Sequence, residues 1–137
     1  MAEPQGADAT AVIGLWQAAG LTRPWNDPRS DALRAHATYP ELFLVATERD
    51  VIVGTMMAGD DGHRGWVYYL AVAADLRRTG LGRTLMARAE ELLTARGCAK
   101  IQLMVRSDNA DVVAFYDRLG YERSDVAVLG RRLDADA

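Results

Sequence analysis

The chain has a single cysteine, Cys98, among its 137 residues. One cysteine cannot form an intrachain disulfide, and this favours a reducing compartment. No stretch approaches the roughly 18 uninterrupted apolar residues that a membrane helix requires. The first nine residues, MAEPQGADA, also lack the basic start and apolar core of a signal peptide. These absences predict a soluble, cytoplasmic protein that does not enter a membrane.

The chain also lacks an excess of positive charge, since its formal net charge is -3 at pH 7. Neutralising phosphates along a nucleic acid requires clustered Lys and Arg in excess, so the composition argues against a nucleic-acid partner. The acidic balance is compatible with a cationic substrate. Neither His36 nor His63 has a partner at a metal-ligand spacing, and we therefore expect no metal.

The domain organisation follows from length and local composition. A chain of 137 residues fits one domain that buries its own core. Residues 1–9 contain Pro4 and Gly6 and few large apolar side chains, which predicts a flexible N-terminus. We expect residues 10–137 to form the single domain.

Apolar periodicity and turn residues predict a mixture of helices and strands. Helices are expected at residues 10–19, from residue 30 or 31 to 38, from the glycine turn near residue 80 to about residue 97, and at 109–119. Strands are expected at 43–48, 51–59, 66–72 and 99–105, with one or two more in 121–133. The first three strands form an antiparallel meander. A helical crossover makes the strands at 66–72 and 99–105 parallel. The apolar run at 99–105 is typical of a strand buried on both faces. The fold class is therefore α+β, or mixed α/β, with helices packed on a central sheet.

A glycine-containing turn lies between the strand at 66–72 and the helix that follows it. Its sequence, RRTGLGR, places Gly80 and Gly82 at the helix N-terminus, where backbone N–H groups have no intrahelical partner and attract a phosphate. Glycine allows close backbone approach to such a group. Arg77, Arg78 and Arg83 add cationic donors. The turn is predicted to hold a pyrophosphate.

Two common phosphate-binding patterns are excluded by spacing. A Walker loop needs a Gly-Lys pair, which does not occur, and a dinucleotide fingerprint needs a third glycine where Leu85 stands. The pattern Arg77, Gly80, Gly82, after a strand and before a helix, resembles the acetyl-CoA turn of the GNAT family of N-acetyltransferases. The alternative is a purely structural turn, in which Gly80 ends a loop and Gly82 loosens the first turn of the helix.

A second segment, RSDNADVVAFYDRLGYE, strengthens the resemblance. Asn109, Val113 and Tyr116 are spaced by four and three residues, so they share one helical face. In the family the Asn position contacts the pantetheine arm, and the Tyr hydroxyl donates a proton to the departing thiolate. The alternatives are an N-cap for Asn109 and core packing for Tyr116.

The resemblance implies a GNAT-type fold, with a mostly antiparallel mixed sheet, helices on both faces and a splayed parallel strand pair. It extends over about residues 10–133 and is most specific over 66–121. It also implies direct acetyl transfer from acetyl-CoA to a primary amine, with a backbone N–H near Val72 polarising the thioester carbonyl. The cofactor-binding residues are then expected to be Leu70, Ala71, Val72, Arg77, Arg78, Thr79, Gly80, Leu81, Gly82, Arg83, Asn109 and Tyr116, with Tyr116 as the catalytic residue.

The sequence departs from the family pattern in two places. No β-rich run precedes the first helix, so the usual first strand is absent or too degenerate to read. No carboxylate occurs between Gly65 and Ala74, where many members carry a glutamate as general base. Trp25, Tyr68 and Tyr69 are candidate substrate contacts, and strict alternation would put the two tyrosines on opposite faces of their strand.

The closest resemblance is to small bacterial acetyltransferases of the YpeA type and to ribosomal-protein-alanine acetyltransferases. The acceptor is therefore a small-molecule amine or, alternatively, a protein N-terminal α-amine. The missing carboxylate leaves a second reading open, a GNAT-fold module that binds acyl-CoA without turnover. The family includes many dimers, which leaves a homodimer open.

Overall fold

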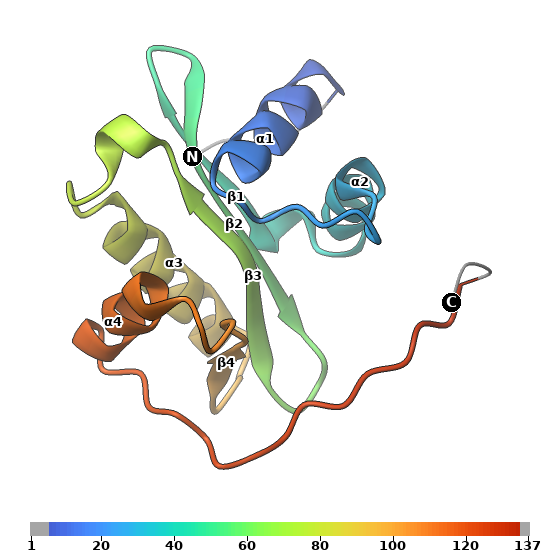
Figure 1. Cartoon of the computed structure of the whole chain (residues 1–137), viewed down its shortest axis with the longest axis vertical. Coiled ribbons are helices and arrows are strands. Elements are labelled where there is room, and N and C mark those ends of the chain that lie inside the picture. The colour runs from blue at the N-terminus through green and yellow to red at the C-terminus, as the bar shows by residue number, and fades with distance from the viewer. Residues whose placement is uncertain (1–5, 135–137) are drawn as a thin grey trace. The chain divides into compact units, whose positions relative to one another are not determined.

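The computed structural model describes residues 6–134, which fall into two compact units divided between Met104 and Val105 (Figure 1). The elements of the first unit are α1 (Gly6–Ala18), α2 (Pro28–Thr38), the short 3-10 helix η1 (Pro40–Leu42), β1 (Phe43–Glu48), β2 (Val51–Asp60), β3 (Gly65–Val72), a second short 3-10 helix η2 (Ala74–Leu76), α3 (Leu81–Ala95) and β4 (Ile101–Leu103). The second unit contains α4 (Ala110–Arg118). None of the helices in the described range is long and apolar enough to cross a membrane.

The sheet has the strand order β1-β2-β3-β4, antiparallel for the first three strands and parallel between β3 and β4. Arg49 and Asp50 join β1 to β2, and both have positive φ, 52° and 65°. Two successive left-handed residues match the twist of a two-residue hairpin. The α+β fold class predicted from the sequence is confirmed, parallel pair included.

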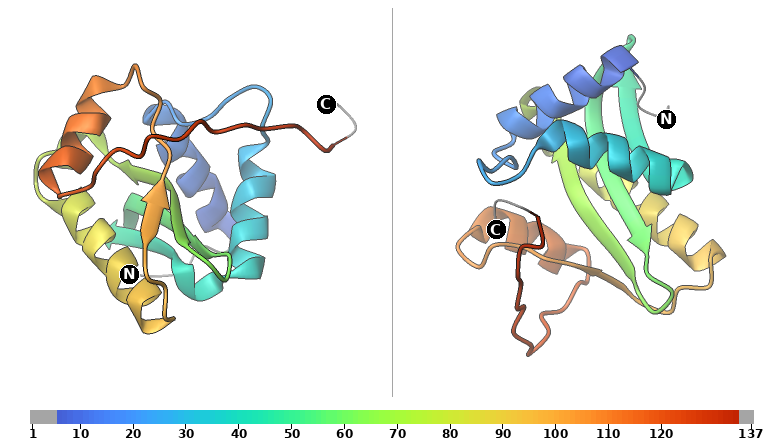
Figure 2. Two further views of the ribbon diagram at one scale, coloured as in Figure 1. Left: turned by 90° about the horizontal axis from the view of Figure 1, so that it is seen from below. Right: turned by 90° about the vertical axis from the view of Figure 1, so that its right-hand side faces the viewer.

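Helices cover both faces of the sheet within this unit, with α1 and α2 on one face and α3 on the other (Figure 2). Trp16 of α1 packs with Phe43 and Val45 of β1 and with Ala71 of β3. On the opposite face α3 buries Leu85, Met86, Ala89 and Leu93. At Gly65 a Cβ would lie 2.6 Å from Leu93 Cδ1, so a larger residue there would force the buried Leu93 side chain to shift.

A buried threonine links α1 to an irregular point of β3. Thr55 of β2 is fully buried; its Oγ1 accepts a hydrogen bond from Trp16 Nε1 at 2.9 Å and donates one to the Tyr69 carbonyl at 3.0 Å. At this point the pairing of β2 with β3 shifts register between Thr55 and Met57. Tyr69 has a φ of 53°, which is costly for a residue with a side chain. The threonine therefore helps to hold a β-bulge in place.

We expect Thr55→Val to lower the free energy of unfolding by about 2–4 kcal/mol, because it leaves a buried indole N–H and a carbonyl without their partner. Urea unfolding followed by tryptophan fluorescence measures the change. Thr47→Val, an exposed position of β1, is the matched control and is expected to change little. Equal losses in the two variants would contradict the assignment of Thr55 to the bulge.

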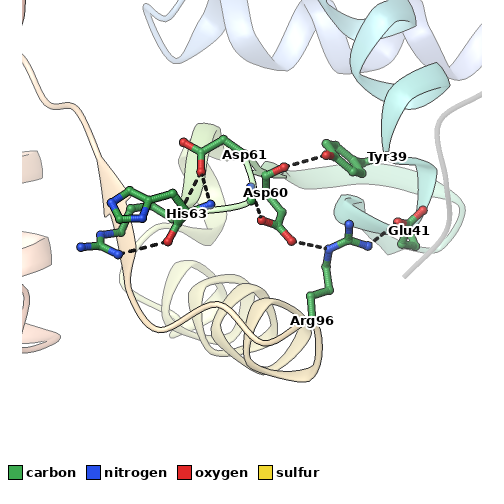
Figure 3. A network of polar contacts seen from close by, with 8 residues as sticks. Tyr39, Glu41, Asp60, Asp61, His63 and Arg96 are labelled. Carbon is green, nitrogen blue, oxygen red and sulfur yellow. Dashed lines mark hydrogen bonds and ion pairs between the residues drawn. The ribbon is translucent and has the colours of Figure 1, made fainter.

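At the end of the sheet where β2 turns into β3, one arginine forms ion pairs with two other elements (Figure 3). Arg96, at the C-terminus of α3, pairs with Asp60 of β2 and Glu41 of η1, both at 3.1 Å. Its guanidinium lies 5.0 Å from the centre of the Tyr39 ring. The backbone N–H of Gly62 and the Arg96 side chain hold the pKa of Asp60 below its ordinary value. Asp60 therefore holds the turn that follows β2 and links it to the end of α3.

The helix boundaries differ from expectation in three places. Residues 6–9 form the first turn of α1, where the sequence indicated a start at Thr10; residues 1–5, where a first strand was in question, lie outside the described residues. The expected start of α2 at Ser30 or Asp31 is wrong by two or three residues, because Pro28 occupies the first helical turn and Asp27 accepts the N–H of Arg29. At the other end, α3 stops at Ala95.

Two strand predictions are also corrected. The strand expected at residues 99–105 is confined to Ile101–Leu103 and is half-buried, because β3 is its only strand partner among the described residues. The strand or strands expected in residues 121–133 do not form. That segment is extended without a ladder, and Val126, Val128 and Leu129 are exposed. The expected strand or strands therefore have no ladder among the described residues.

Candidate functional site

The glycine turn connects the end of β3 to the start of α3, as the sequence predicts. Gly80 is the N-cap of α3 with a φ of 92°, a conformation that favours glycine. Two residues earlier Arg78 also has a positive φ, 68°. Backbone conformations of this kind persist only where the surrounding structure imposes them, and they concentrate at ligand-binding turns.

The turn presents several unused donors. The first helical hydrogen bond of α3 runs from Thr84 N to Gly80 O at 3.0 Å, and no described side chain caps the helix. The N–H groups of Leu81, Gly82 and Arg83 therefore stand at the positive end of the helix dipole without intrahelical partners. Arg77 donates from Nε to the Val72 carbonyl at 3.3 Å, which fixes the turn to the end of β3. This combination fits a bound anion such as a pyrophosphate.

The end of β3 exposes backbone on one edge. β4 pairs only with Gly65, Trp66 and Val67 of β3, so residues 68–72 have no described strand partner on that side. Ala73 N donates to Val53 O of β2 at 2.8 Å. Since N–H groups alternate sides along an extended chain, the N–H of Val72 points away from β2, toward this unpaired edge. A carbonyl oxygen placed there would meet a donor already aimed at it.

The two candidate tyrosines lie on the same side of the sheet, and the expectation of opposite faces is wrong. Both line a groove of about 360 Å³ together with Leu21, Asn26, Asp31 and Met57. The bulge is the reason, because two residues of β3, Tyr69 and Leu70, stand opposite Met56 alone. Tyr69 also stacks on Trp16, with ring centres 3.9 Å apart.

Asp31 of α2 is a groove residue that sequence reasoning missed. The Tyr69 hydroxyl donates to Asp31 Oδ2 at 2.8 Å. Burial, followed by this hydrogen bond, raises the pKa of Tyr69 well above its ordinary value, so its hydroxyl remains a donor at neutral pH. A contact across 38 residues leaves no local signal in the sequence.

Other residues expected at the site are placed as follows. The Ala71 side chain is buried in the core, 3% exposed, so only its backbone can meet a ligand. Leu70 and Val72 are half-buried. Trp25 is 57% exposed and does not line the groove that holds the two tyrosines. Its substrate contact stays a prediction.

The second unit holds the other two residues singled out by the sequence. Asn109 is the N-cap of α4, and its side-chain oxygen accepts the N–H of Val112 at 3.3 Å. Tyr116 is 8% exposed, with its ring 5.0 Å from Phe115 and 5.5 Å from Tyr121. Burial raises the pKa of Tyr116 to about 12, so the hydroxyl is protonated at neutral pH. Asn109 therefore caps its helix and Tyr116 packs against aromatic rings, as the structural alternatives for these residues predicted. Both contacts are compatible with a role in cofactor binding or catalysis.

Metal-ligating side chains do not gather anywhere in the described residues. No group of three or more His, Cys, Asp or Glu side chains is arranged there to hold a metal ion.

The sequence matches the family model described as Acetyltransferase (GNAT) family over residues 11–121. An acetyltransferase of Yersinia enterocolitica is 48% identical over 132 residues, covering 96% of this chain and 94% of the relative. The fold is similar to the ribosomal-protein-S18-alanine N-acetyltransferase from Escherichia coli, with a TM-score of 0.71 at 22% identity over 90% of this chain and 77% of the other. It is equally similar to AAC(6')-Iy in complex with the bisubstrate analogue CoA-S-monomethyl-acetylneamine, with a TM-score of 0.71 at 17% identity over 96% and 95% of the two chains.

Proposed function

The chain belongs to the GNAT acetyltransferase family, and we propose that residues 10–137 form a single domain that transfers an acetyl group from acetyl-CoA directly to a primary amine. The observation that carries the proposal is the turn before α3, where three backbone N–H groups and flanking arginines lie in the connection from β3 to α3. A pyrophosphate bound there would extend its pantetheine arm along the unpaired edge of β3. The CoA-based analogue bound by a protein of the same fold supports this choice of ligand.

The residues proposed to hold acetyl-CoA divide by task. Backbone donors and arginines bind the pyrophosphate, the backbone near Val72 polarises the thioester carbonyl, and Asn109 contacts the pantetheine arm. The side chains and backbone involved are those of Leu70, Ala71, Val72, Arg77, Arg78, Thr79, Gly80, Leu81, Gly82, Arg83, Asn109 and Tyr116. Each is an assignment by family pattern, supported at the turn by the unused donors.

Transfer needs two proton movements besides the acyl step. A neutral amine nitrogen forms the new C–N bond as the C–S bond breaks, and the proton lost by that nitrogen passes to solvent. Tyr116 supplies a proton to the departing sulfur and afterwards regains one from water. Its raised pKa keeps the phenol in the protonated form that this role requires. No covalent enzyme intermediate is involved, so Cys98 takes no part.

Two alternatives remain within this framework. The acceptor is either a small-molecule amine or a protein N-terminal α-amine, the latter supported by the fold shared with the Escherichia coli enzyme. The absence of any carboxylate between Gly65 and Ala74 favours a second candidate, a module that binds acyl-CoA without turnover. Measured acetylation of any amine would exclude it.

The first test is the melting temperature of the protein with acetyl-CoA, with free CoA and with ATP. Ligand at 100 times its dissociation constant adds about 2.7 kcal/mol of stability, a rise of roughly 5–10 °C for a domain of this size. We expect acetyl-CoA and CoA to raise the melting temperature and ATP to have no effect. No shift with either CoA ligand would refute the proposal.

A further inference from the structure

Two adjoining grooves lie on the face of the sheet that α1 and α2 cover, and both are lined by the carboxylate of Asp31. The first, of about 360 Å³, is lined by Leu21, Asn26, Asp31, Met57, Tyr68 and Tyr69. The second, of about 270 Å³, includes Arg34 and Tyr39 among its lining residues and shares Asp31, Met57 and Tyr68 with the first. Asp31 is the only charged residue lining the first groove in the described part of the chain.

The Asp31 carboxylate is oriented and only partly used. Its Oδ2 accepts from the Tyr69 hydroxyl, which is itself fixed by the stacking of Tyr69 on Trp16. Among the described residues none donates to Oδ1, and no Arg or Lys forms an ion pair with this side chain. Arg34 lines the second groove and not the first. Among the described residues, no other charged side chain lines the first groove beside this carboxylate.

The surroundings of this charge suit a cation. Tyr68 and Tyr69 bring aromatic rings to the same groove, and Met57 adds a polarisable thioether. Carboxylate and aromatic faces together bind ammonium or guanidinium groups better than either does alone. The groove also borders residues 68–72 of β3, which have no described strand partner on the β4 side. The acetyl group of the cofactor is proposed to bind along this same stretch.

We propose that Asp31 binds a positively charged group of the acceptor, separate from the amine that is acetylated, so that this protein selects acceptors with a cationic tail. The proposal rests on the proposed acetyltransferase function and names its substrate class. The reacting amine must be neutral when it attacks, whereas the second charge is held by Asp31 Oδ1 in the groove that Tyr68 and Tyr69 also line. Asp31 is a binding residue in this scheme, and Tyr69 positions its carboxylate.

The test uses pairs of acceptors that differ only in tail charge. One pair is 1,4-diaminobutane and 1-aminobutane; the other is the amides of the dipeptides Ala-Lys and Ala-Leu. We expect the wild-type protein to prefer the charged member by about 10-fold or more in kcat/KM, the usual worth of a charge-assisted hydrogen bond. Asp31→Asn keeps an oxygen for the Tyr69 hydroxyl and should lose that preference, mainly through KM, while the acetyl-CoA melting shift is unchanged.

The matched control is Glu48→Gln, an exposed carboxylate at the end of β1 that lines neither groove. It should retain the wild-type preference. A measurement on the wild-type protein needs no variant: raising the salt concentration should weaken the preference for the charged tail, because exposed charges are screened.

Three results would overturn the proposal: equal use of charged and neutral tails by the wild type, a preference that survives in Asp31→Asn, or a protein that binds acetyl-CoA and acetylates neither charged acceptor. The absence of both turnover and an acetyl-CoA melting shift has a different meaning. It would refute the proposed function itself, and the acceptor proposal with it.

Discussion

Gly82→Trp is expected to weaken acetyl-CoA binding about 100-fold or more, since an indole at the second residue of α3 would cover N–H groups that each contribute as charge-assisted donors. The fold should survive, because the position is half-buried within regular helix and tryptophan has a higher helix propensity than glycine. Isothermal titration with CoA gives the affinity, and circular dichroism with a thermal melt reports the fold.

Thr94→Trp is the control for this experiment. It introduces the same side chain on an exposed position near the other end of α3, and it should leave the affinity for CoA within about twofold, as is usual for a surface substitution. Unchanged CoA binding by a folded Gly82→Trp protein would show that the pyrophosphate is held elsewhere. The unused donors of Leu81, Gly82 and Arg83 would then need another explanation.

Tyr116→Phe is expected to lower kcat by about 100- to 1,000-fold, the usual range for a lost general acid. The affinity for acetyl-CoA should change little, because the ring that packs against Phe115 and Tyr121 is retained. Steady-state kinetics with any accepted amine, combined with a CoA titration, separates the two effects. The variant also distinguishes an enzyme from a module that only binds acyl-CoA.

Tyr121→Phe removes the same hydroxyl from the neighbouring ring and is the matched control. It should leave kcat close to the wild-type value. Similar losses of kcat in both variants would indicate a general disturbance of the α4 unit, and an unaltered kcat in Tyr116→Phe would remove this residue from the mechanism.

The elements that were predicted well are those with local signals. The hairpin at Arg49 and Asp50 lies between two β-rich runs, and the turn at Gly80 separates an apolar strand from an amphipathic helix. Asn109 also caps its helix, which was the alternative to a cofactor contact that the sequence left open for this residue. In each case the residues that decide the structure are adjacent in the chain, so pattern and propensity suffice.

The features that were missed depend on contacts between distant residues. The local sequence around Tyr68 and Tyr69 does not indicate a bulge. The bulge is held by the hydrogen bond that Thr55, on the neighbouring strand, donates to the Tyr69 carbonyl. The pairing of Asp31 with Tyr69 arises from the packing of α2 on the sheet. In residues 121–133 the opposite error occurred: one or two strands were expected, but the described residues offer no partner strand to complete a ladder.

The bulge in β3 divides the strand into a stretch that presents side chains and a stretch that presents backbone groups. Before it, side chains such as that of Tyr68 line the groove; after it, Val72 and the turn offer mainly backbone groups. Most substitutions leave a backbone donor in place unless the new side chain covers it, whereas any substitution in the groove changes the lining group itself. Relatives could therefore diversify their acceptors by point mutation on one side of the bulge while inheriting the same cofactor chemistry on the other.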